Sequence, residues 1–229
     1  CLVGSEMCIR DRLHAALKQV LGDHVNQAGS YVGPDRLRFD FSHFSPVTEE
    51  ELRKVEEIVN DQILAAKDVT IEELPIDEAK KRGAVALFGE KYGSIVRVVT
   101  VPGFSMEFCG GVHVGNTAQI GMFKILSESS TGAGVRRIEA VTGHGALNYV
   151  REMEDMVKTA ATGLKCRSND LCARICALQS DYKAAEQKIS ELEGQIAKAQ
   201  VSDAASSVCN IKGVPVLVQK VSALSLIHI

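Results

Sequence analysis

The chain has no apolar run approaching the roughly 20 residues that a bilayer-spanning helix needs, which argues against a membrane protein. It also has no excess of positive charge, because 29 Asp and Glu residues outnumber 26 Lys and Arg residues. This balance excludes a protein that holds nucleic acid by a broad basic face, so any nucleic acid must be bound locally. The seven cysteines form no disulfide framework, which favours reduced thiols in a cytosol.

The two ends of the chain lack the patterns of the sequence between them. Residues 1–12 (CLVGSEMCIRDR) begin with Cys instead of Met and show neither helical nor strand periodicity. Residues 222–229 also depart from the pattern of the segment before them. A secretory signal is a poor interpretation of the first segment, because it contains no h-region. We expect both ends to be non-native, adapter-derived sequence, and the fold prediction rests on residues 13–221.

Residues 13–143 mix helical and strand patterns. The spacing of apolar residues predicts the end of a helix at 13–21 and a second helix from Thr48, where Thr48 and Glu51 have the form of a capping box. Alternating or β-branched runs predict strands at residues 37–42, 69–74, 94–101, 122–127 and 135–142. Helices and adjacent strand pairs in this order predict an α+β layered domain that ends near Gly143.

A different pattern covers residues 144–200, where apolar residues recur alternately four and three positions apart. This spacing is the a/d seam of a heptad repeat, and it is interrupted near Gly163. The interruption predicts an antiparallel helical hairpin, a coiled coil, better than one long rod. Residues 201–221 then predict a polar linker and the truncated start of a further C-terminal domain. The seam after the interruption consists of Leu171, Ile175, Leu178, Tyr182, Ala185, Ile189, Leu192, Ile196 and Ala199.

The most informative short stretch is Cys109-Gly110-Gly111-Val112-His113. A thiolate and an imidazole four residues apart can both reach one Zn²⁺, and the paired glycines permit a tight turn between them. Taken alone, the pattern is more typical of a small buried Cys at the end of a strand with a His nearby. Two ligands do not complete a site, because zinc normally takes four protein ligands, or three and a water.

The stretch from Ser105 to Val114 resembles the C-G-G-T-H-V signature of alanyl-tRNA synthetase editing domains. Two further stretches resemble the same family, namely HVNQAGS at 24–30 with LRFDFSH at 37–43, and GVRRIEAVTG at 134–143. The helical hairpin and the segment at 213–218 follow in the family's order. The resemblance covers residues 13–221.

The resemblance implies a zinc-dependent hydrolase region within an ATP-dependent ligase that attaches alanine to tRNA(Ala). This region would remove wrongly attached serine or glycine at the 3′ end of tRNA(Ala). The family's metal is held by the residues matching Cys109 and His113 and by an H-x-x-x-H pair on a helix, whose members share one face. That pair should fall on Met7 and Asp11, so the Zn²⁺ site is incomplete, which we attribute to truncation. No ATP-binding region is visible, so the chain should not charge tRNA by itself.

Other residues take roles only through the resemblance. Gln27 matches a position in the family's editing pocket, where its amide would orient the substrate, although a Gln in a loop is ordinarily a solvated residue. Arg136 and Arg137 would hold tRNA phosphates, although on a strand one of the two would face solvent. His14 matches a further family His, but a lone helical His is more often structural. The implied setting is cytoplasmic and without a membrane, and a homo-oligomeric parent is compatible with it.

Two other functions stay open at this point. The chain could be a free-standing trans-editing aminoacyl-tRNA deacylase, although such an enzyme needs neither the heptad hairpin nor a further domain. It could also be a non-catalytic tRNA-binding or spacer fragment, in which the incomplete metal shell leaves no catalysis. Zinc stoichiometry together with deacylation of Ser-tRNA(Ala) would separate the enzyme from the binding module.

Overall fold

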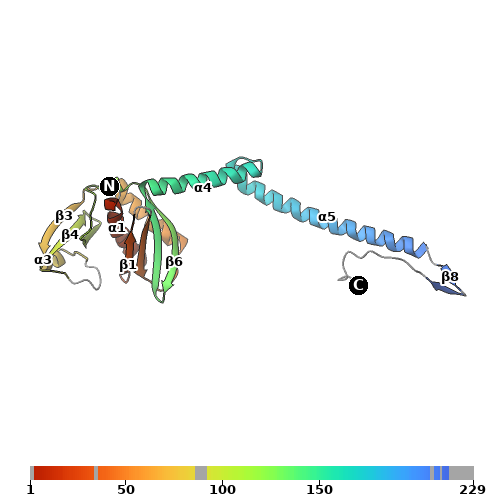
Figure 1. Cartoon of the computed structure of the whole chain (residues 1–229), viewed down its shortest axis with the longest axis horizontal. Helices are drawn as coiled ribbons and strands as arrows, with labels where there is room; N and C mark the ends of the chain where they lie inside the picture. The colour runs from red at the N-terminus through yellow and green to blue at the C-terminus, as the bar shows by residue number, and fades with distance from the viewer. Residues whose placement is uncertain (1–2, 34–35, 86–91, 207–208, 212, 217–229) are drawn as a thin grey trace. The chain divides into compact units, whose positions relative to one another are not determined.

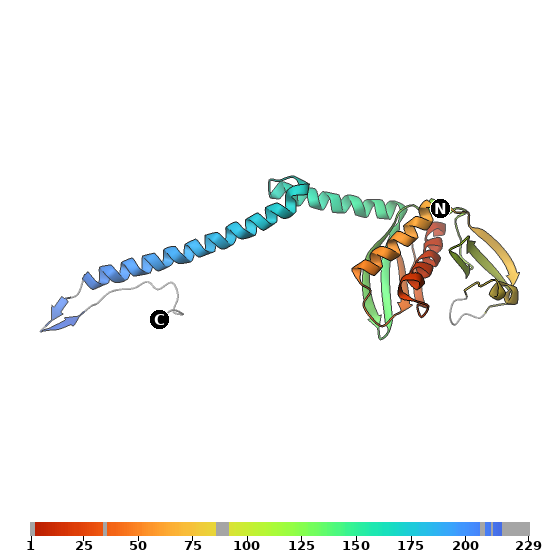
Figure 2. The same ribbon diagram turned by 180° about the vertical axis from the view of Figure 1, so that it is seen from behind.

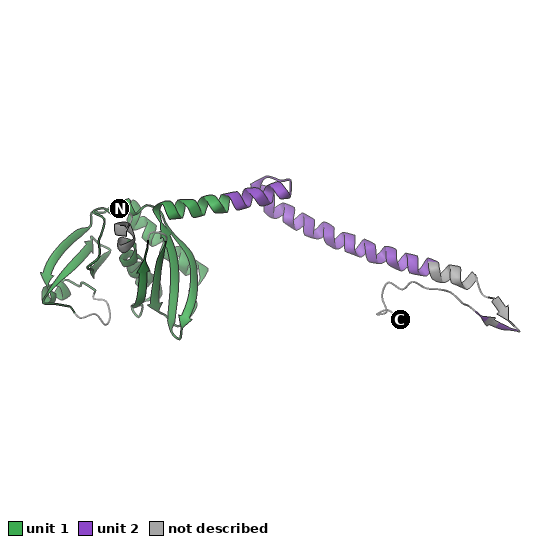
Figure 3. Cartoon of the chain, viewed as in Figure 1, with its two compact units in different colours: residues 1–154 green, residues 155–229 purple. Residues whose placement is uncertain are grey.

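The computed structural model describes residues 3–33, 36–85, 92–206, 209–211 and 213–216 (Figure 1). The chain divides into two compact units, residues 1–154 and residues 155–229 (Figure 3). The first unit has the mixed helices and antiparallel sheets expected of an α+β fold, and the second is mainly helical. The predicted fold class is therefore confirmed.

The first unit contains a four-stranded antiparallel sheet in the order β1-β2-β7-β6. Its strands are β1 (Gln27–Val32), β2 (Leu37–Ser42), β6 (Phe123–Gly132) and β7 (Val135–Thr142). In β2 the side chains of Leu37, Phe39 and Phe41 are buried and those between them are half-buried, which is the predicted alternation. Helices α1 (Val3–Leu21) and α2 (Glu49–Leu64) cover one face of the sheet (Figure 2), and the core lies between them and the strands.

The helix α1 begins at Val3 and not near Leu13. The prediction that residues 13–21 are the end of a helix agrees with this range, and residues 3–12, which show no helical periodicity in the sequence, form the earlier part of the same helix. Ile9 continues the buried stripe of Leu13, Ala16 and Leu17 onto the core. Whether residues 1–12 are native stays a prediction. The start of α2 is as predicted, since Thr48 and Glu51 form a capping box with N–H to side-chain oxygen distances of 2.8 and 3.2 Å.

A second antiparallel sheet in the same unit has the order β3-β4-β5. It consists of β3 (Thr70–Pro75), β4 (Ile95–Val101) and β5 (Ser105–Phe108), with α3 (Ile76–Lys81) packed beside β3 and β4. A small core of Ala79, Val96, Val98 and Phe108 holds this layer together. The helix α1 also contacts β5, so the site described below lies where the first helix meets the second sheet.

Helix α4 (Gly143–Gly163) runs across the boundary of the two units and ends in a turn in which Lys165 has a φ of 53°. After η2 (Ser168–Asp170), helix α5 (Leu171–Ser206) carries the predicted heptad seam. Seam residues such as Tyr182 and Ile196 are 64% and 58% exposed within the described part of the chain. The two helices are therefore confirmed, while their packing as a hairpin stays a prediction. None of the described helices is long and apolar enough to cross a membrane.

The chain continues past α5 into a short antiparallel pair, β8 (Cys209–Ile211) and β9 (Val214–Val216). The strand-like pattern at 214–221 is thus seen in part, and residues 217–229 lie outside the described residues. The predicted boundaries at 143, 200 and 221 stay predictions.

Candidate metal centre

The loop after β5 is fixed by Arg97 of β4. The N–H of Cys109 donates to the carbonyl oxygen of Arg97 at 3.1 Å, which extends the β4–β5 pairing past the end of β5. The Arg97 guanidinium Nη1 donates in return to the carbonyl oxygens of Cys109 at 2.7 Å and of Gly111 at 2.5 Å. Arg97 therefore holds the loop folded back on itself and fixes the positions of the loop's side chains.

This loop brings the two predicted ligands together. The Nε2 atom of His113 lies 3.0 Å from the Sγ atom of Cys109. Cys109 is 4% exposed, and the side chain of His113 is fully buried. The pairing predicted from their spacing is thus present in the geometry, while zinc ligation by the two residues stays a prediction.

Helix α1 adds a third potential ligand, Asp11, from the opposite side. Its Oδ2 atom lies 3.6 Å from Nε2 of His113, and the potential ligand atoms of Asp11, Cys109 and His113 all lie within 4.8 Å of one another. In the sequence, position 11 is of interest only because it holds Asp where the family has a His. A carboxylate can, however, also bind zinc. The side chain of Met7, the other expected position, lies outside the described residues.

Arg10 supplies a positive charge inside the same cluster. Its guanidinium donates to Oδ1 of Asp11 at 2.7 and 2.9 Å and to Sγ of Cys109 at 3.0 Å. Arg10 is 6% exposed and Asp11 is 2% exposed, so these bonds form away from water. Nothing in the sequence pattern indicated this contact, because it joins residues 99 positions apart.

Burial shifts the pKa values of all three potential ligands. Desolvation, reinforced by the nearby Glu107 carboxylate, raises the pKa of Asp11 to about 6. Desolvation, together with the charges of Arg12, Arg97 and Arg10, lowers the pKa of His113 to about 4. Desolvation and the Asp11 carboxylate raise the pKa of the Cys109 thiol. At neutral pH the cluster therefore presents a carboxylate, a neutral imidazole and a thiol.

The donor set fits zinc in a three-ligand shell. Sulfur, imidazole nitrogen and carboxylate oxygen are the atoms zinc prefers, and three protein ligands with one open position are typical of catalytic sites. No fourth His, Cys, Asp or Glu of the described residues joins the group. Binding of the ion would require Arg10 to release Sγ of Cys109, whereas Arg10 bonds Oδ1 of Asp11 and leaves Oδ2, which faces His113, open to the ion.

The other predicted site residues lie apart from this cluster and have partners of their own. Gln27 lies at the start of β1, where its amide donates to Oγ of Ser30 at 3.1 Å. Arg137 makes a bidentate pair with Asp40 at 2.7 and 2.8 Å. Arg136 makes a bidentate pair with Glu128. Both arginines are thus neutralised by carboxylates, and roles for all three in binding substrate or tRNA stay predictions.

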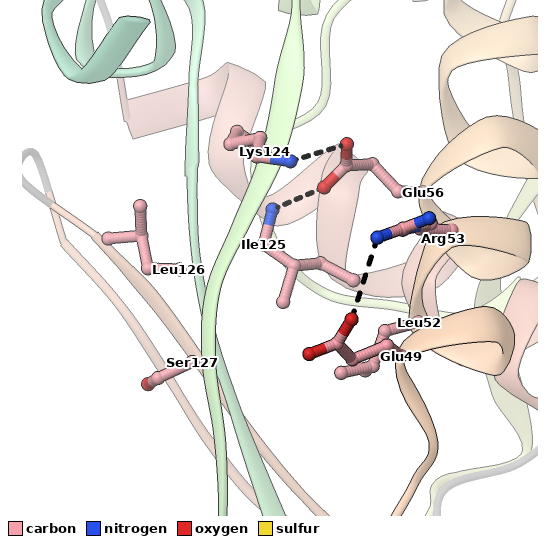
Figure 4. A pocket seen from close by; sticks show the side chains of 8 residues that line it. All are labelled: Glu49, Leu52, Arg53, Glu56, Lys124, Ile125, Leu126 and Ser127. Carbon is pink, nitrogen blue, oxygen red and sulfur yellow. Dashed lines mark hydrogen bonds and ion pairs between the residues drawn. The ribbon is translucent and has the colours of Figure 1, made fainter. Parts of the chain in front are cut away.

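A separate cavity of about 170 Å³ lies between α2 and β6 (Figure 4). The polar groups that line this cavity bind one another. Glu56 accepts hydrogen bonds from Lys124 Nζ at 2.9 Å and from the N–H of Ile125 at 3.0 Å. Glu49 similarly pairs with Arg53 at 3.5 Å. Glu56 thereby satisfies part of the free edge of β6, which is a structural role.

Comparison with known proteins agrees with the resemblance seen in the sequence. Residues 96–139, which include Arg97, Cys109 and His113, match the family model described as "Threonyl and Alanyl tRNA synthetase second additional domain". Over 211 residues the chain is 54% identical to an alanine–tRNA ligase of Listeria monocytogenes serotype 4b, a match that covers 92% of the chain and 24% of that protein.

Other relatives give the same result. The chain is 51% identical over 211 residues to an alanine–tRNA ligase of Desulforamulus reducens. It is 52% identical over 217 residues to one of Bacillus pumilus, which covers 95% of the chain and 25% of that protein. The resemblance to alanyl-tRNA synthetases is confirmed, and the chain spans about a quarter of the length of these curated relatives.

Proposed function

We propose that the chain is the proofreading region of an alanine–tRNA ligase and hydrolyses Ser-tRNA(Ala) and Gly-tRNA(Ala). The observation that carries this proposal is the buried pair of Cys109 and His113, with Nε2 of His113 at 3.0 Å from Sγ of Cys109 and the carboxylate of Asp11 beside them. Two of these residues lie within the segment that matches the synthetase additional domain. Attachment of alanine to tRNA(Ala) is assigned to the parent ligase and only hydrolysis to this chain.

In the proposed reaction, water attacks the carbonyl carbon of the aminoacyl ester at the 3′ end of tRNA. The ester C–O bond breaks, the amino acid leaves as a carboxylic acid, and the tRNA ribose oxygen takes a proton. Zinc held by Asp11, Cys109 and His113 would supply a Lewis acid for this step. His113 is suited to ligation because its lowered pKa keeps it neutral, and Arg97 holds the Cys109 loop in place.

Selection against correctly charged tRNA has a physical basis. A pocket that hydrogen-bonds the hydroxyl group of serine rejects alanine strongly, because the polar groups of the pocket would be left unpaired. This argument does not cover glycine, which also lacks a hydroxyl group, so hydrolysis of Gly-tRNA(Ala) is proposed from the resemblance alone. Gln27 is the proposed source of one hydrogen bond to the serine hydroxyl group. Its amide would give up its hydrogen bond to Ser30 and bond the substrate instead. Arg136 and Arg137 are the proposed phosphate contacts, again by exchange of their carboxylate partners. We assign this activity to the cytoplasm.

One observation favours a second candidate, a tRNA-binding or spacer fragment without catalysis. The guanidinium of Arg10 already provides the cation that Cys109 Sγ and Asp11 bind. If these bonds persist in the presence of zinc, the cluster is a buried ion-pair network and not a metal site. Zinc content therefore separates the two functions.

The test is deacylation of Ser-tRNA(Ala) and Ala-tRNA(Ala) by the full chain, with zinc added or removed by a chelator. The proposal predicts hydrolysis of the seryl ester, little hydrolysis of the alanyl ester, and loss of activity in the Cys109→Ala variant. Cys172→Ala, which changes an exposed cysteine of α5, is the matched control and should retain the activity. Seryl ester that stays intact at saturating zinc would refute the hydrolase and support the spacer.

A further inference from the structure

A cavity of about 250 Å³ lies between α1 and β5, beside the metal cluster. Its walls include apolar side chains of Val85, Phe104 and Met106. Its polar lining includes His14, Lys18 and Glu107. The cavity therefore combines an apolar enclosure with a small number of polar groups, as small-ligand sites commonly do.

Two of the polar groups are deeply buried, and one of them, the ring of His14, makes no hydrogen bond within the described part of the chain. His14 is 3% exposed and Glu107 is 5% exposed. The Nδ1 atom of His14 lies 3.4 Å from Oε1 of Glu107, and neither ring nitrogen of His14 makes a hydrogen bond to a described residue. Buried polar atoms are nearly always hydrogen-bonded, so the open bonding positions of His14 beside a cavity indicate a ligand or water bound there.

The cavity and the metal cluster share the same two structural elements. On β5 and its extension, Glu107 and Cys109 are two residues apart, so both side chains point to the same side of the strand. On α1, Asp11 and His14 are three residues apart, so they lie on the same helical face. A ligand bound against Glu107 and His14 would thus have its next few atoms directed toward Cys109 and Asp11.

The negative and positive side chains that line the cavity lie at different depths. The carboxylate of Glu107 is at the buried end, whereas Lys18 is only half-buried and Gln19 beside it is exposed. This order is complementary to a ligand with an ammonium group at one end and a phosphate some distance away. An aminoacyl ester of a nucleotide has these groups in this order, with the ester between them.

We propose that Glu107 and His14 bind the α-ammonium group of the aminoacyl ester, which directs the ester carbonyl to the Asp11–Cys109–His113 cluster. The inference rests on the proposed hydrolase function and specifies its substrate class as nucleotide esters with a free α-amino group. Esters whose amino group is acylated carry no positive charge for Glu107 and are excluded. Lys18 faces the nucleotide phosphate at the mouth of the cavity.

The test is calorimetric binding of two stable probes to the full chain, 3′-(L-seryl)amino-3′-deoxyadenosine and its N-acetyl derivative. We expect the free amine to bind at least about tenfold tighter, the scale of a charged hydrogen bond in a buried site. In Glu107→Gln the two probes should bind equally. Glu57→Gln, which removes an exposed carboxylate of α2, should keep the preference for the free amine. Circular dichroism checks that each variant is folded.

The results separate the inference from the hydrolase function when Ser-tRNA(Ala) hydrolysis is measured on the same preparations. Equal binding of both probes to the unmodified chain overturns the inference without any variant, and so does failure of both to bind. A preference that survives in Glu107→Gln overturns it as well. If the preference depends on Glu107 but the chain does not hydrolyse Ser-tRNA(Ala), the subsite stands and the proposed function fails.

Discussion

The strand side and the helix side of the metal cluster are built in different ways. On the strand side, Cys109 makes two hydrogen bonds with Arg97, one to its main chain and one from its side chain. The Arg97 side chain also donates to the carbonyl oxygen of Gly111, and His113 follows in the same loop. On the helix side, Asp11 is held mainly by the side chain of Arg10, one residue before it. A short motif on a paired strand thus fixes its own geometry, whereas a helical ligand depends on how the whole helix packs.

Removal of one ligand from each side should give the largest difference in hydrolysis rate between the strand side and the helix side. Cys109→Ala should lower the rate of Ser-tRNA(Ala) hydrolysis by about 1000-fold, the upper range for loss of a group that stabilises the transition state. Asp11→Ala should cost about 10- to 100-fold, because the strand-side ligands still hold part of the shell. Deacylation at saturating zinc checks both values, with Cys172→Ala as the control. Equal losses would show that the two sides contribute alike.

The pH dependence of metal affinity should also be set by the strand side. Burial raises the pKa of the Cys109 thiol, so binding must release its proton, and affinity should rise about tenfold per pH unit between about pH 7 and 9. Asp11, with its pKa at about 6, and His113, with its pKa at about 4, are already deprotonated in that range. Below about pH 6, protonation of Asp11 should steepen the fall in affinity.

Titration with Co²⁺, followed by the thiolate-to-metal absorption band, measures this slope. The band should be missing in Cys109→Ala at every pH. A metal affinity that does not change between pH 7 and 9 would contradict ligation by a thiol with a raised pKa.

Arg97→Gln should have a smaller effect, on stability and metal affinity, which tests how the strand side is held in place. It leaves the carbonyl oxygens of Cys109 and Gly111 without their donor, which should lower the free energy of unfolding by about 2–4 kcal/mol. Co²⁺ affinity should fall about tenfold, the lower range for a residue that orients a metal ligand. Arg97→Lys keeps one donor and should recover part of both losses, as measured by urea denaturation and Co²⁺ titration.

The control for this pair of variants is Arg53→Gln, because Arg53 is exposed and pairs with the exposed Glu49. Its effect on stability should be within about 0.5 kcal/mol. If Arg97→Gln changes metal affinity no more than Arg53→Gln does, Arg97 does not position the Cys109 loop.

Features set by neighbouring residues could be predicted from the sequence. The alternation in β2, the capping box of Thr48 and the approach of Cys109 and His113 all depend on residues that are close along the chain. Strand β5 was missed because Ser105–Phe108 is too short to show a period, and its pairing with β4 comes from the hairpin turn before it.

Contacts between distant segments could not be predicted. The bond from Arg10 to Cys109 and the pairing of His14 with Glu107 depend on the packing of α1 against β5, which no local pattern encodes. Helix α5 gives the opposite case, because its heptad spacing predicted the helix correctly without revealing what covers Leu178 and Ile189, which are 46% and 56% exposed.

X-ray absorption at the zinc edge, on the full chain loaded with one equivalent of Zn²⁺, tests most directly whether the two sides form one metal site. The account predicts one sulfur neighbour at about 2.3 Å and nitrogen or oxygen neighbours at about 2.0–2.2 Å. The sulfur neighbour should disappear in Cys109→Ala, and the average number of oxygen and nitrogen neighbours from protein should fall in Asp11→Ala. Bound zinc without a sulfur neighbour, or no stoichiometric zinc at all, would contradict the account.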